Sequence, residues 1–521
     1  MDPSLMDPLM EYTTPGTDEL NSSIWPDFND TVQFSDGTTI SYNQFTDSLS
    51  IRDAGNTSLL NSIKLSDVIG CDLELDLLAA PFSASIQIYR YERIIPNSSA
   101  SCSSCMCSSS SSSRNNDNEL PTTPTTTTNT KEGHKRLFKR VKSHLTLPLQ
   151  PTMDLAGPRS IVRSIRALSL AKSTSPRRVL TFVNPFSGSK TAMAINDNVL
   201  EPMLRESNIE FTSLVTKSEN HAYEYMSKIT SEEVDTFDGI IVVSGDGLLY
   251  SILNAIQNHV GGVEMRDRIM KKISFGIVNA GSGNGLAKSI TYANGENLTP
   301  MQCVFCILKA LGSNSSNTSD LATYDSCDGK TFTSFLSLSW GIIADVDLES
   351  EVFRFLGPLR LDCYAVWRML SLRRYQGKFS YMEEFPTGEK EWEMPRLNED
   401  LESKSEWKTI EDSFVCFWAC NTTHASYDIM SSPHSEFNDG VFQILLIRGK
   451  KVGRADLVKM FLGMENGEQA SMDCVEFVKC VAYRVEPGGS RGNLSLDGEK
   501  LAYGKVQGVI KRDGGMRLLG S

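Results

Sequence analysis

The sequence has no apolar run long enough to cross a bilayer, which argues against a helical membrane protein. No uninterrupted apolar stretch of the 521-residue chain approaches the ~20 residues that a transmembrane helix needs. The first residues, "MDPSLMDPLMEYTTPGTDEL", lack the basic start and the apolar centre of a secretory signal. We therefore expect a cytoplasmic globular protein whose cysteines stay reduced.

The chain also lacks an excess of basic charge. It contains 51 Lys and Arg against 64 Asp and Glu, a net charge of −13, which argues against a nucleic-acid partner. The charge is uneven, because residues 131–178 hold 12 Lys and Arg and only two acidic residues. This segment is either a solvated basic linker or a surface that contacts an anionic membrane and recruits the protein peripherally.

The sequence lacks a complete set of cysteine and histidine ligands for a metal ion. Cys102, Cys105 and Cys107 have metal-like spacing, but no further cluster of cysteine or histidine lies near them. Most of the 12 cysteines are scattered through apolar stretches, as buried thiols are. We therefore predict no resident metal site in the protein.

Composition and periodicity divide the chain into five parts. Residues 1–30 are expected to be disordered. Alternating patterns broken by turn dipeptides predict a small β-rich module at 31–96. Residues 97–175 are Ser- and Thr-rich and then basic, which indicates a low-complexity linker. Strands alternating with helices predict a doubly wound parallel α/β domain at 176–320, and successive strands predict a largely β domain at 321–515.

Within the α/β domain, apolar periodicity predicts each element in turn. Helical stretches are expected between the strands, up to Glu206, over Glu219–Ile229 and after each of the last two strands. One helical insert is expected in the second domain, near Leu359–Leu372. The predicted strands are Val179–Val183, Ile209–Val215, Ile240–Ser244 and Ile273–Val278.

Three Gly-rich turns follow strands of the predicted sheet: Asn184–Lys190, Ser244–Gly247 and Asn279–Gly285. The carboxyl ends of parallel strands meet at one edge, where such sheets bind ligands. Glycine lets backbone amides approach phosphate oxygens, and the following helix N-termini add positive dipole ends. Together the turns favour phosphate binding, although none matches a P-loop or dinucleotide fingerprint. Ordinary turns, with Asp246 as a helix cap, remain the alternative.

The segments "NPFSGSK", "SGDGLLYSILNAI", "NAGSGNGLAKSI", "WGIIADVDLESEVFRFLGPLRLD" and "LDGEKL" occur in the order found in sphingosine kinases. Over about residues 178–511 the chain resembles this family of diacylglycerol-kinase-like lipid kinases. The resemblance implies an α/β nucleotide domain joined to a β-sandwich lipid domain. It also implies ATP with Mg²⁺ in the cleft between them, and phosphorylation of the primary hydroxyl of sphingosine or another sphingoid base.

The resemblance assigns roles to individual residues. Asp246, expected to face the cleft, would be the general base. Ser244, Gly245 and Gly247 would hold the reacting end of the lipid, and Asp347 its cationic amino-alcohol head. The residues that it implies for nucleotide binding are Asn184, Pro185, Phe186, Thr216, Asn220, Gly281, Ser282, Gly283, Arg354, Arg360, Asp497, Gly498 and Glu499.

Two of these nucleotide residues, Arg354 and Arg360, would neutralise phosphate charge with forked guanidinium groups. The competing interpretation is that they form ion pairs with Glu349 or Glu351.

The chain departs from the family pattern near the nucleotide. Ser251 stands where relatives have Glu, Glu219 where a basic residue is expected, Asn279 where Pro precedes the third turn, and Phe186 where some relatives are basic. These changes would weaken ATP binding or mark a lipid-binding adaptor with a degenerate kinase fold. The rival enzymes are a kinase for a neutral lipid (diacylglycerol or ceramide) and a NAD kinase. Asp347 favours a cationic substrate, because a neutral headgroup gives no reason to bury a carboxylate.

Overall fold

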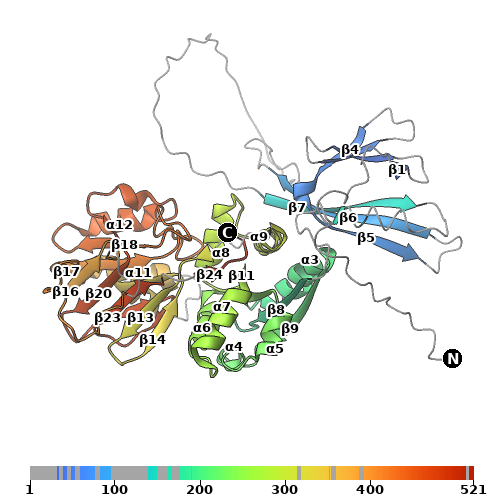
Figure 1. Cartoon of the computed structure of the whole chain (residues 1–521). Coiled ribbons are helices and arrows are strands. Elements are labelled where there is room, and N and C mark those ends of the chain that lie inside the picture. The colour runs from blue at the N-terminus through green and yellow to red at the C-terminus, as the bar shows by residue number, and fades with distance from the viewer. Residues whose placement is uncertain are drawn as a thin grey trace, which may run out of the picture.

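The computed structural model of the protein has three folded parts in chain order (Figure 1). They are the N-terminal β-rich module, the α/β domain and the second, largely β domain. The predicted disorder of residues 1–30 and the clustered cysteines at 102–107 lie outside the residues that the structure describes. The described residues are 32–33, 39–43, 48–52, 59–76, 83–94, 139–149, 162, 165–166, 177–188, 190–313, 318–350, 352–353, 360–386, 392–511 and 515–520.

The N-terminal module consists of two antiparallel sheets, as the alternating pattern predicts. The four-stranded sheet has the order β1-β2-β3-β4, and the three-stranded sheet the order β5-β6-β7. The strands are β1 (Val32–Gln33), β2 (Thr39–Asn43), β3 (Ser48–Arg52), β4 (Leu59–Lys64), β5 (Val68–Asp76), β6 (Ser83–Ile94) and β7 (Lys139–Leu149).

The predicted boundary of this module is wrong. Residues 139–149, assigned from sequence to the basic linker, form β7 and pair with β6 from Ile94↔Lys139 to Ala84↔Leu149. The strand was not predicted because its basic residues are typical of a linker. Their carboxylate partners lie far away in the sequence. Arg140 is buried against Asp67 and Glu296, so it is not available to a membrane surface.

The module packs on the α/β domain at α3 (Glu201–Glu206) and α9 (Pro300–Ser313) (Figure 1). The Tyr91 hydroxyl donates a hydrogen bond of 2.9 Å to Glu206 at the end of α3, and Lys142 pairs with the same carboxylate. Ile69 and Tyr91 are part of the α/β domain's own hydrophobic core. The module is thus fixed by shared core as well as by charge.

The α/β domain contains a four-stranded parallel sheet of order β11-β10-β8-β9. Its strands are β8 (Arg177–Val183), β9 (Ile209–Val215), β10 (Gly239–Ser244) and β11 (Ser274–Asn279). One group of helices in contact is α4 (His221–Met226), α5 (Ser231–Thr236), α6 (Asp246–Gln257) and α7 (Gly262–Lys272). The other is α2 (Ala192–Ile195), a π-helical turn (Asn196–Leu200), α3 (Glu201–Glu206), α8 (Gly285–Ala293) and α9 (Pro300–Ser313).

These elements confirm the predicted alternation, and the parallel strands are at most two residues from the expected bounds. The helix predicted at Glu219–Ile229 is shorter, since α4 covers only His221–Met226. Two separate helix groups are what a doubly wound sheet needs, because β8 and β10 are buried along most of their length and require cover on both faces.

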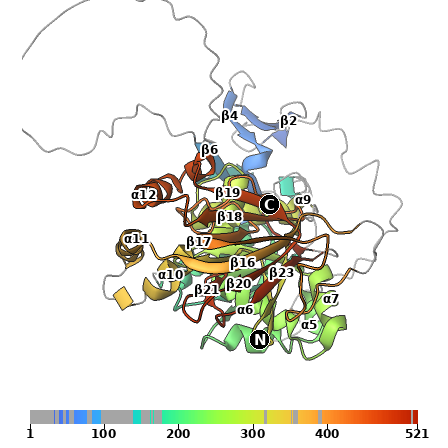
Figure 2. The same cartoon turned by 90° about the vertical axis from the view of Figure 1, so that its left-hand side faces the viewer.

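The second domain contains an antiparallel sheet of eleven strands, with β14-β13-β23-β20-β16-β17-β15-β21-β22 in order and β18 and β19 joined through β17. Figure 2 shows β16, β20 and β23 side by side. The strands are β13 (Ala322–Ser326), β14 (Thr331–Ser334), β15 (Ser337–Gly341), β16 (Tyr375–Met382), β17 (Lys408–Cys420), β18 (Phe442–Arg448), β19 (Glu476–Cys480), β20 (Ala482–Pro487), β21 (Leu494–Leu496), β22 (Glu499–Lys500) and β23 (Val506–Ile510).

Three helices accompany this sheet: α10 (Ile342–Glu349), α11 (Arg360–Ser371) and α12 (Arg454–Gly463). The predicted insert near Leu359–Leu372 is therefore confirmed as α11. Together the helices cover a second apolar core with Trp418, Leu445 and Ile447. No helix in the described part of the chain is long and apolar enough to cross a membrane.

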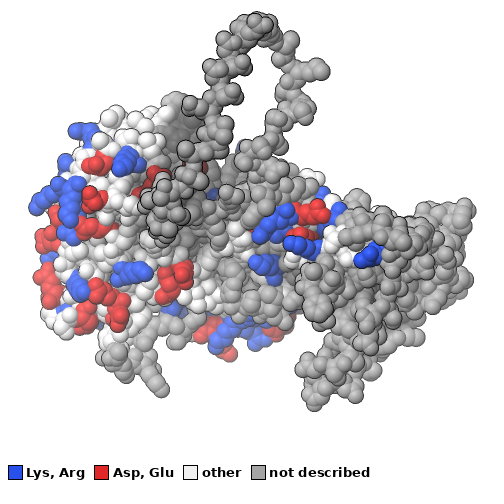
Figure 3. All heavy atoms as spheres, turned by 90° about the horizontal axis from the view of Figure 1, so that it is seen from above, with Lys and Arg blue, Asp and Glu red and all other residues white. Residues whose placement is uncertain are grey.

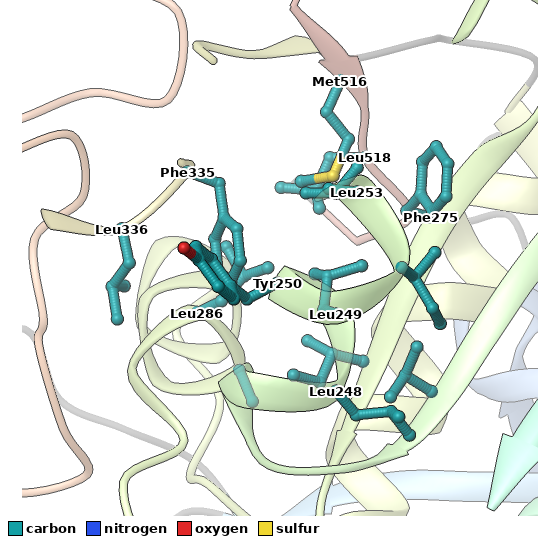
Figure 4. Close-up of a cluster of buried hydrophobic side chains, with 14 of the residues drawn as sticks. Leu248, Leu249, Tyr250, Leu253, Phe275, Leu286, Phe335, Leu336, Met516 and Leu518 are labelled. Carbon is teal, nitrogen blue, oxygen red and sulfur yellow. The ribbon is translucent and has the colours of Figure 1, made fainter. Parts of the chain in front are cut away.

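The chain passes between the two domains twice. On the way out it forms β12 (Thr318–Ser319), which pairs antiparallel with β24 (Met516–Arg517) on the way back. Leu518 then bridges Phe275 of β11. Figure 4 shows Met516 and Leu518 beside α6, with Phe335 of the second domain near Tyr250 of that helix. One hydrophobic core is therefore continuous between the domains.

Candidate active site

The three Gly-rich turns meet at the carboxyl edge of the parallel sheet, as the sequence predicts. The Ser187 hydroxyl oxygen accepts hydrogen bonds from the Ser244 hydroxyl at 3.1 Å and from the Gly245 amide at 3.3 Å. The second and third turns approach more closely still. A Cβ on Gly281 would lie 2.2 Å from the Gly245 Cα, a distance that no side chain tolerates.

Asp246 is buried, contrary to the expectation that it faces an open cleft. It is the first residue of α6, yet its carboxylate binds the start of α8, accepting hydrogen bonds from the amides of Gly285 (2.7 Å) and Leu286 (3.1 Å). Only 8% of the residue is exposed. Burial raises the pKa of the Asp246 carboxyl, while these amide donors act in the opposite direction. The alternative prediction, that Asp246 caps its own helix, is wrong, because the N-cap residue of α6 is Gly245 and no side chain caps that helix.

The first nucleotide candidates border this junction. The Asn184 side chain accepts a hydrogen bond of 3.0 Å from the Phe186 amide and shapes the first turn, and the Phe186 side chain is 67% exposed. Thr216 is buried where β9 ends, and Asn220 is the N-cap residue of α4. In the third turn, Ser282 is exposed. All five follow strand ends of one sheet.

The structure describes the side chain of neither arginine that the resemblance assigns to phosphate binding. Arg354 lies outside the described residues. Arg360 is the first residue of α11, and its side chain also lies outside them. Glu349, the competing partner for these arginines, accepts hydrogen bonds from Arg373 at 3.3 Å and Asn493 at 2.6 Å.

The turn between β21 and β22 reaches the start of α6. Asp497 is buried with a φ of 51°, and its oxygens accept hydrogen bonds from the Ser334 hydroxyl and the amides of residues 335–337. Burial raises its pKa to about 6. Glu499 extends farther, with Oε1 3.4 Å from the position of a Cβ on Gly247. Asp497 therefore shapes the turn, and Glu499 extends from this hairpin toward Gly247 at the start of α6.

A second carboxylate acts on Glu499 electrostatically. Burial raises the pKa of Glu499, and the negative charge of Glu219 raises it further. Glu219 is the position where the resemblance leads us to expect a basic residue. Among the described residues, no group of three or more potential metal ligands occurs.

Asp347, the lipid-head candidate, is half-buried on α10. Its Oδ2 accepts a hydrogen bond of 2.6 Å from the Ser495 hydroxyl on β21. Two residues farther along the same hairpin is Asp497, and then Glu499. The β21–β22 hairpin therefore runs from the lipid-head candidate to the start of α6, and this is how the structure relates the two sites.

The more deeply buried carboxylate of this helix is Asp345, which sequence reasoning missed. It pairs with the buried Arg368 of α11 and accepts hydrogen bonds from Tyr375 and, at 3.0 Å, from Asn493. Because a buried unpaired charge is very costly, this group fixes α10 against α11 and the sheet. The first aspartate of "ADVD" lies between apolar residues, the one signal that could have revealed it.

A loop of the second domain closes on the third Gly-rich turn. The Tyr427 amide donates a hydrogen bond of 2.7 Å to the Gly283 carbonyl, and the His424 amide one of 3.0 Å to the Ser289 hydroxyl on α8. Burial lowers the pKa of His424 to about 3, so its ring is neutral at physiological pH. Nothing in the sequence distinguishes this loop.

The chain is similar to several known lipid kinases. Residues 178–315 match the diacylglycerol kinase catalytic domain family. The chain is 32% identical to sphingosine kinase 1 of Rattus norvegicus over 352 residues, which is 64% of this chain and 89% of that protein. It is 30% identical to sphingosine kinase 2 of Arabidopsis thaliana over 63% of this chain and 70% of that protein. A diacylglycerol kinase structure from Bacillus anthracis aligns with 66% of this chain and 97% of its own at 16% identity and a TM-score of 0.43.

The contact between Gly281 and Gly245 yields a prediction. Replacing Gly281→Ala would force the second and third turns apart, because the new Cβ would overlap the Gly245 backbone. We expect a loss of about 2 kcal/mol or more in unfolding free energy and much weaker ATP binding, measured by urea unfolding and calorimetry. Gly283→Ala is the matched control for stability, since its Cβ would meet nothing closer than Asp246 Oδ2 at 3.6 Å. Equal stability of the two variants would contradict the close-packing argument.

Proposed function

The chain belongs to the sphingosine kinase family, and from this premise we propose that it transfers the γ-phosphoryl group of ATP to the primary hydroxyl of a sphingoid base, giving a sphingoid-base 1-phosphate. The observation that carries the proposal is the β21–β22 hairpin. It connects Asp347, suited to an ammonium group, with Glu499 beside the Gly-rich turns, which are suited to phosphates.

Asp246 is the proposed general base. As the hydroxyl oxygen attacks the γ-phosphorus, its proton passes to the carboxylate. The bond between the γ-phosphorus and the oxygen that bridges to the β-phosphate breaks, and ADP leaves with that oxygen and the electron pair of the bond. Burial raises the pKa of this carboxyl, which increases its affinity for a proton. The amides of Gly285 and Leu286 hold the carboxylate in one orientation. Ser244, Gly245 and Gly247 surround it and would position the reacting end of the lipid.

The nucleotide would lie along the Gly-rich turns, with the exposed Ser282 and the flanking Gly281 and Gly283 offering backbone amides to its phosphates. Arg354 and Arg360 are proposed to neutralise the phosphate charge, as are contacts from the turn at Asp497, Gly498 and Glu499. The first-turn residues Asn184, Pro185 and Phe186, with Thr216 and Asn220, would complete the nucleotide site.

Mg²⁺ is the proposed cofactor of the transfer. ATP phosphates supply most of its ligands in kinases, with one or two carboxylates added by the protein. Glu499 is the carboxylate that we propose for this contact, because its Oε1 lies 3.4 Å from the position of a Cβ on Gly247, beside the Gly-rich turns. When bound, the ion would neutralise charge that develops on the phosphate oxygens.

We propose that the second domain is a β-sandwich. Its apolar core would accept the hydrocarbon chain of the lipid. Asp347 is half-buried at the border of the core covered by α10, α11 and α12, so an ammonium group could meet it while the hydrocarbon stays in apolar surroundings. A neutral lipid would offer this carboxylate no positive charge. A diacylglycerol or ceramide kinase is therefore the second candidate, supported by the family of the catalytic domain.

Peripheral membrane binding is part of the proposal, because the lipid must be taken from a bilayer. Large apolar side chains are exposed on adjacent helices of the second domain, with Trp367 50% and Leu370 60% exposed on α11 and Leu462 78% exposed on α12. Such a patch is typical of an interface. Elsewhere on the described surface, acidic and basic side chains lie interspersed (Figure 3). The basic segment 131–178 would contribute less than its composition predicts, since Arg140 and Lys142 have carboxylate partners.

The base assignment predicts the behaviour of Asp246→Asn. We expect turnover to fall by about 10²–10⁴-fold, because the amide cannot accept the proton. The variant should also lose about 1–3 kcal/mol of stability, since one α8 amide loses its acceptor. The measurements are initial rates at saturating ATP and urea unfolding.

The control for that variant is Asp320→Asn, another buried carboxylate that accepts a backbone amide, from Gly440 at 2.7 Å. It should lose stability but keep its turnover. Near-normal turnover of Asp246→Asn would remove the base assignment.

The lipid-head assignment predicts a change of specificity in Asp347→Asn, which keeps the size of the side chain and removes its charge. The KM for sphingosine should rise about tenfold or more, and the preference for sphingosine over diacylglycerol should narrow. Initial rates with each lipid in mixed micelles give both values. If the variant keeps its full preference, Asp347 does not bind the headgroup.

The membrane assignment predicts that Trp367→Ser combined with Leu462→Ser weakens binding to phosphatidylcholine–phosphatidylserine vesicles about tenfold, because two large apolar side chains no longer enter the interface. Vesicle sedimentation measures this. The matched control combines Val260→Ser with Val263→Ser, which are similarly exposed on the α/β domain. Equal effects of the two pairs would show that the α11–α12 patch is not the membrane contact.

A further inference from the structure

A cavity of about 240 Å³ lies between the N-terminal module and the α/β domain. The module contributes Lys64 at the end of β4, Ser66 and Asp67 just after it, Arg93 on β6 and Arg140 on β7. Asn294 and Glu296 after α8, with Phe305, Cys306 and Lys309 of α9, form the opposite wall. The cavity would hold several water molecules and is smaller than most drug-sized sites. None of the residues assigned to ATP or lipid lines it.

The floor of the cavity is a closed ion network. Arg140 donates to Glu296 through Nε at 3.0 Å and Nη2 at 2.9 Å, and to Asp67 through Nη1 at 2.8 Å. Its guanidinium stacks on the Phe305 ring, 3.4 Å from the centroid. Arg93 adds a second guanidinium to Glu296 at 2.7 Å. Two carboxylates thus balance two arginines.

The rim keeps positive charge that this network does not balance. Lys64 and Lys309 are both exposed, and neither forms an ion pair with a described residue. Lys309 donates only to the neutral Asn294 side chain, at 2.9 Å. The two lysines come from opposite walls, one from the module and one from α9. Beside them are the Ser66 hydroxyl and Arg93, both exposed.

We propose that this cavity binds a phosphate group, either free in solution or on the headgroup of an anionic lipid. A compact anion with several oxygens can accept hydrogen bonds from both lysines at once, and charge-assisted bonds of this kind are the strong ones. The buried Arg140 network supplies a rigid, pre-formed floor, so little order has to be gained on binding. The ligand would join the module to the catalytic domain, which gives the N-terminal extension a function as one wall of a binding site.

The test uses the full chain with its nucleotide site filled by a non-hydrolysable ATP analogue and Mg²⁺, so that phosphate cannot act there. Inorganic phosphate is titrated while thermal unfolding is followed, since a ligand that binds the folded state raises the midpoint. A second arm measures sedimentation with phosphatidylcholine vesicles that contain or lack phosphatidic acid. The variant combines Lys64→Ala with Lys309→Ala. The control combines Lys228→Ala with Lys271→Ala, two exposed lysines on the side of α4 and α7.

We expect phosphate to stabilise the wild type and the control, and the variant to need about tenfold more phosphate for the same shift. That result identifies soluble phosphate as a sufficient ligand. If only binding to phosphatidic acid vesicles is lost in the variant, the ligand is the lipid headgroup. If wild type, control and variant respond alike in both arms, the proposal is overturned. Kinase activity is not the readout, so failure here leaves the proposed function untouched.

Discussion

The contact on which the site depends is the binding of the Asp246 carboxylate to the first amides of α8. It joins the start of α6 to the start of α8, and thereby fixes the second Gly-rich turn against the third. The same carboxylate is under opposing influences. Burial favours its protonated form, whereas two amide donors and the positive end of the α8 dipole favour its charge. A carboxylate that accepts two backbone amides is held in one orientation.

Close packing of backbone explains why glycine recurs around this contact. Gly281 and Gly245 touch through their Cα atoms, and a Cβ on Gly285 would lie 2.6 Å from the Ala425 carbonyl oxygen of the second domain. From sequence, these glycines indicated room for phosphate oxygens. In the structure, some of them provide room for other segments of the chain, including the loop that covers α8. The turns are therefore mutually dependent, and a change in one displaces the others.

The sequence predicted those parts of the fold that rest on local periodicity. Apolar β-branched runs located the parallel strands within two residues, and turn composition located the Gly-rich junction. It failed where the partner of a residue is distant. The basic run around Arg140 resembled a linker because its carboxylates lie 73 and 156 residues away along the chain. Asp246 was expected in an open cleft because nothing near it reveals α8, and Asp345 was missed because its cation, Arg368, lies on the next helix. The roles drawn from family resemblance alone, such as those of Arg354 and Arg360, stay predictions.

The pairing of β12 with β24 has a consequence for how this architecture can be rearranged. The outgoing and returning strands lie hydrogen-bonded to each other, so the second domain is in effect an insertion whose two ends are adjacent. Residues 516–520 complete the α/β domain, where Leu518 and Leu519 meet Phe275 on β11. An insertion with neighbouring ends can be exchanged for another without altering the fold of its host. The second domain is therefore a unit that evolution can exchange while the parallel sheet and its Gly-rich turns stay intact.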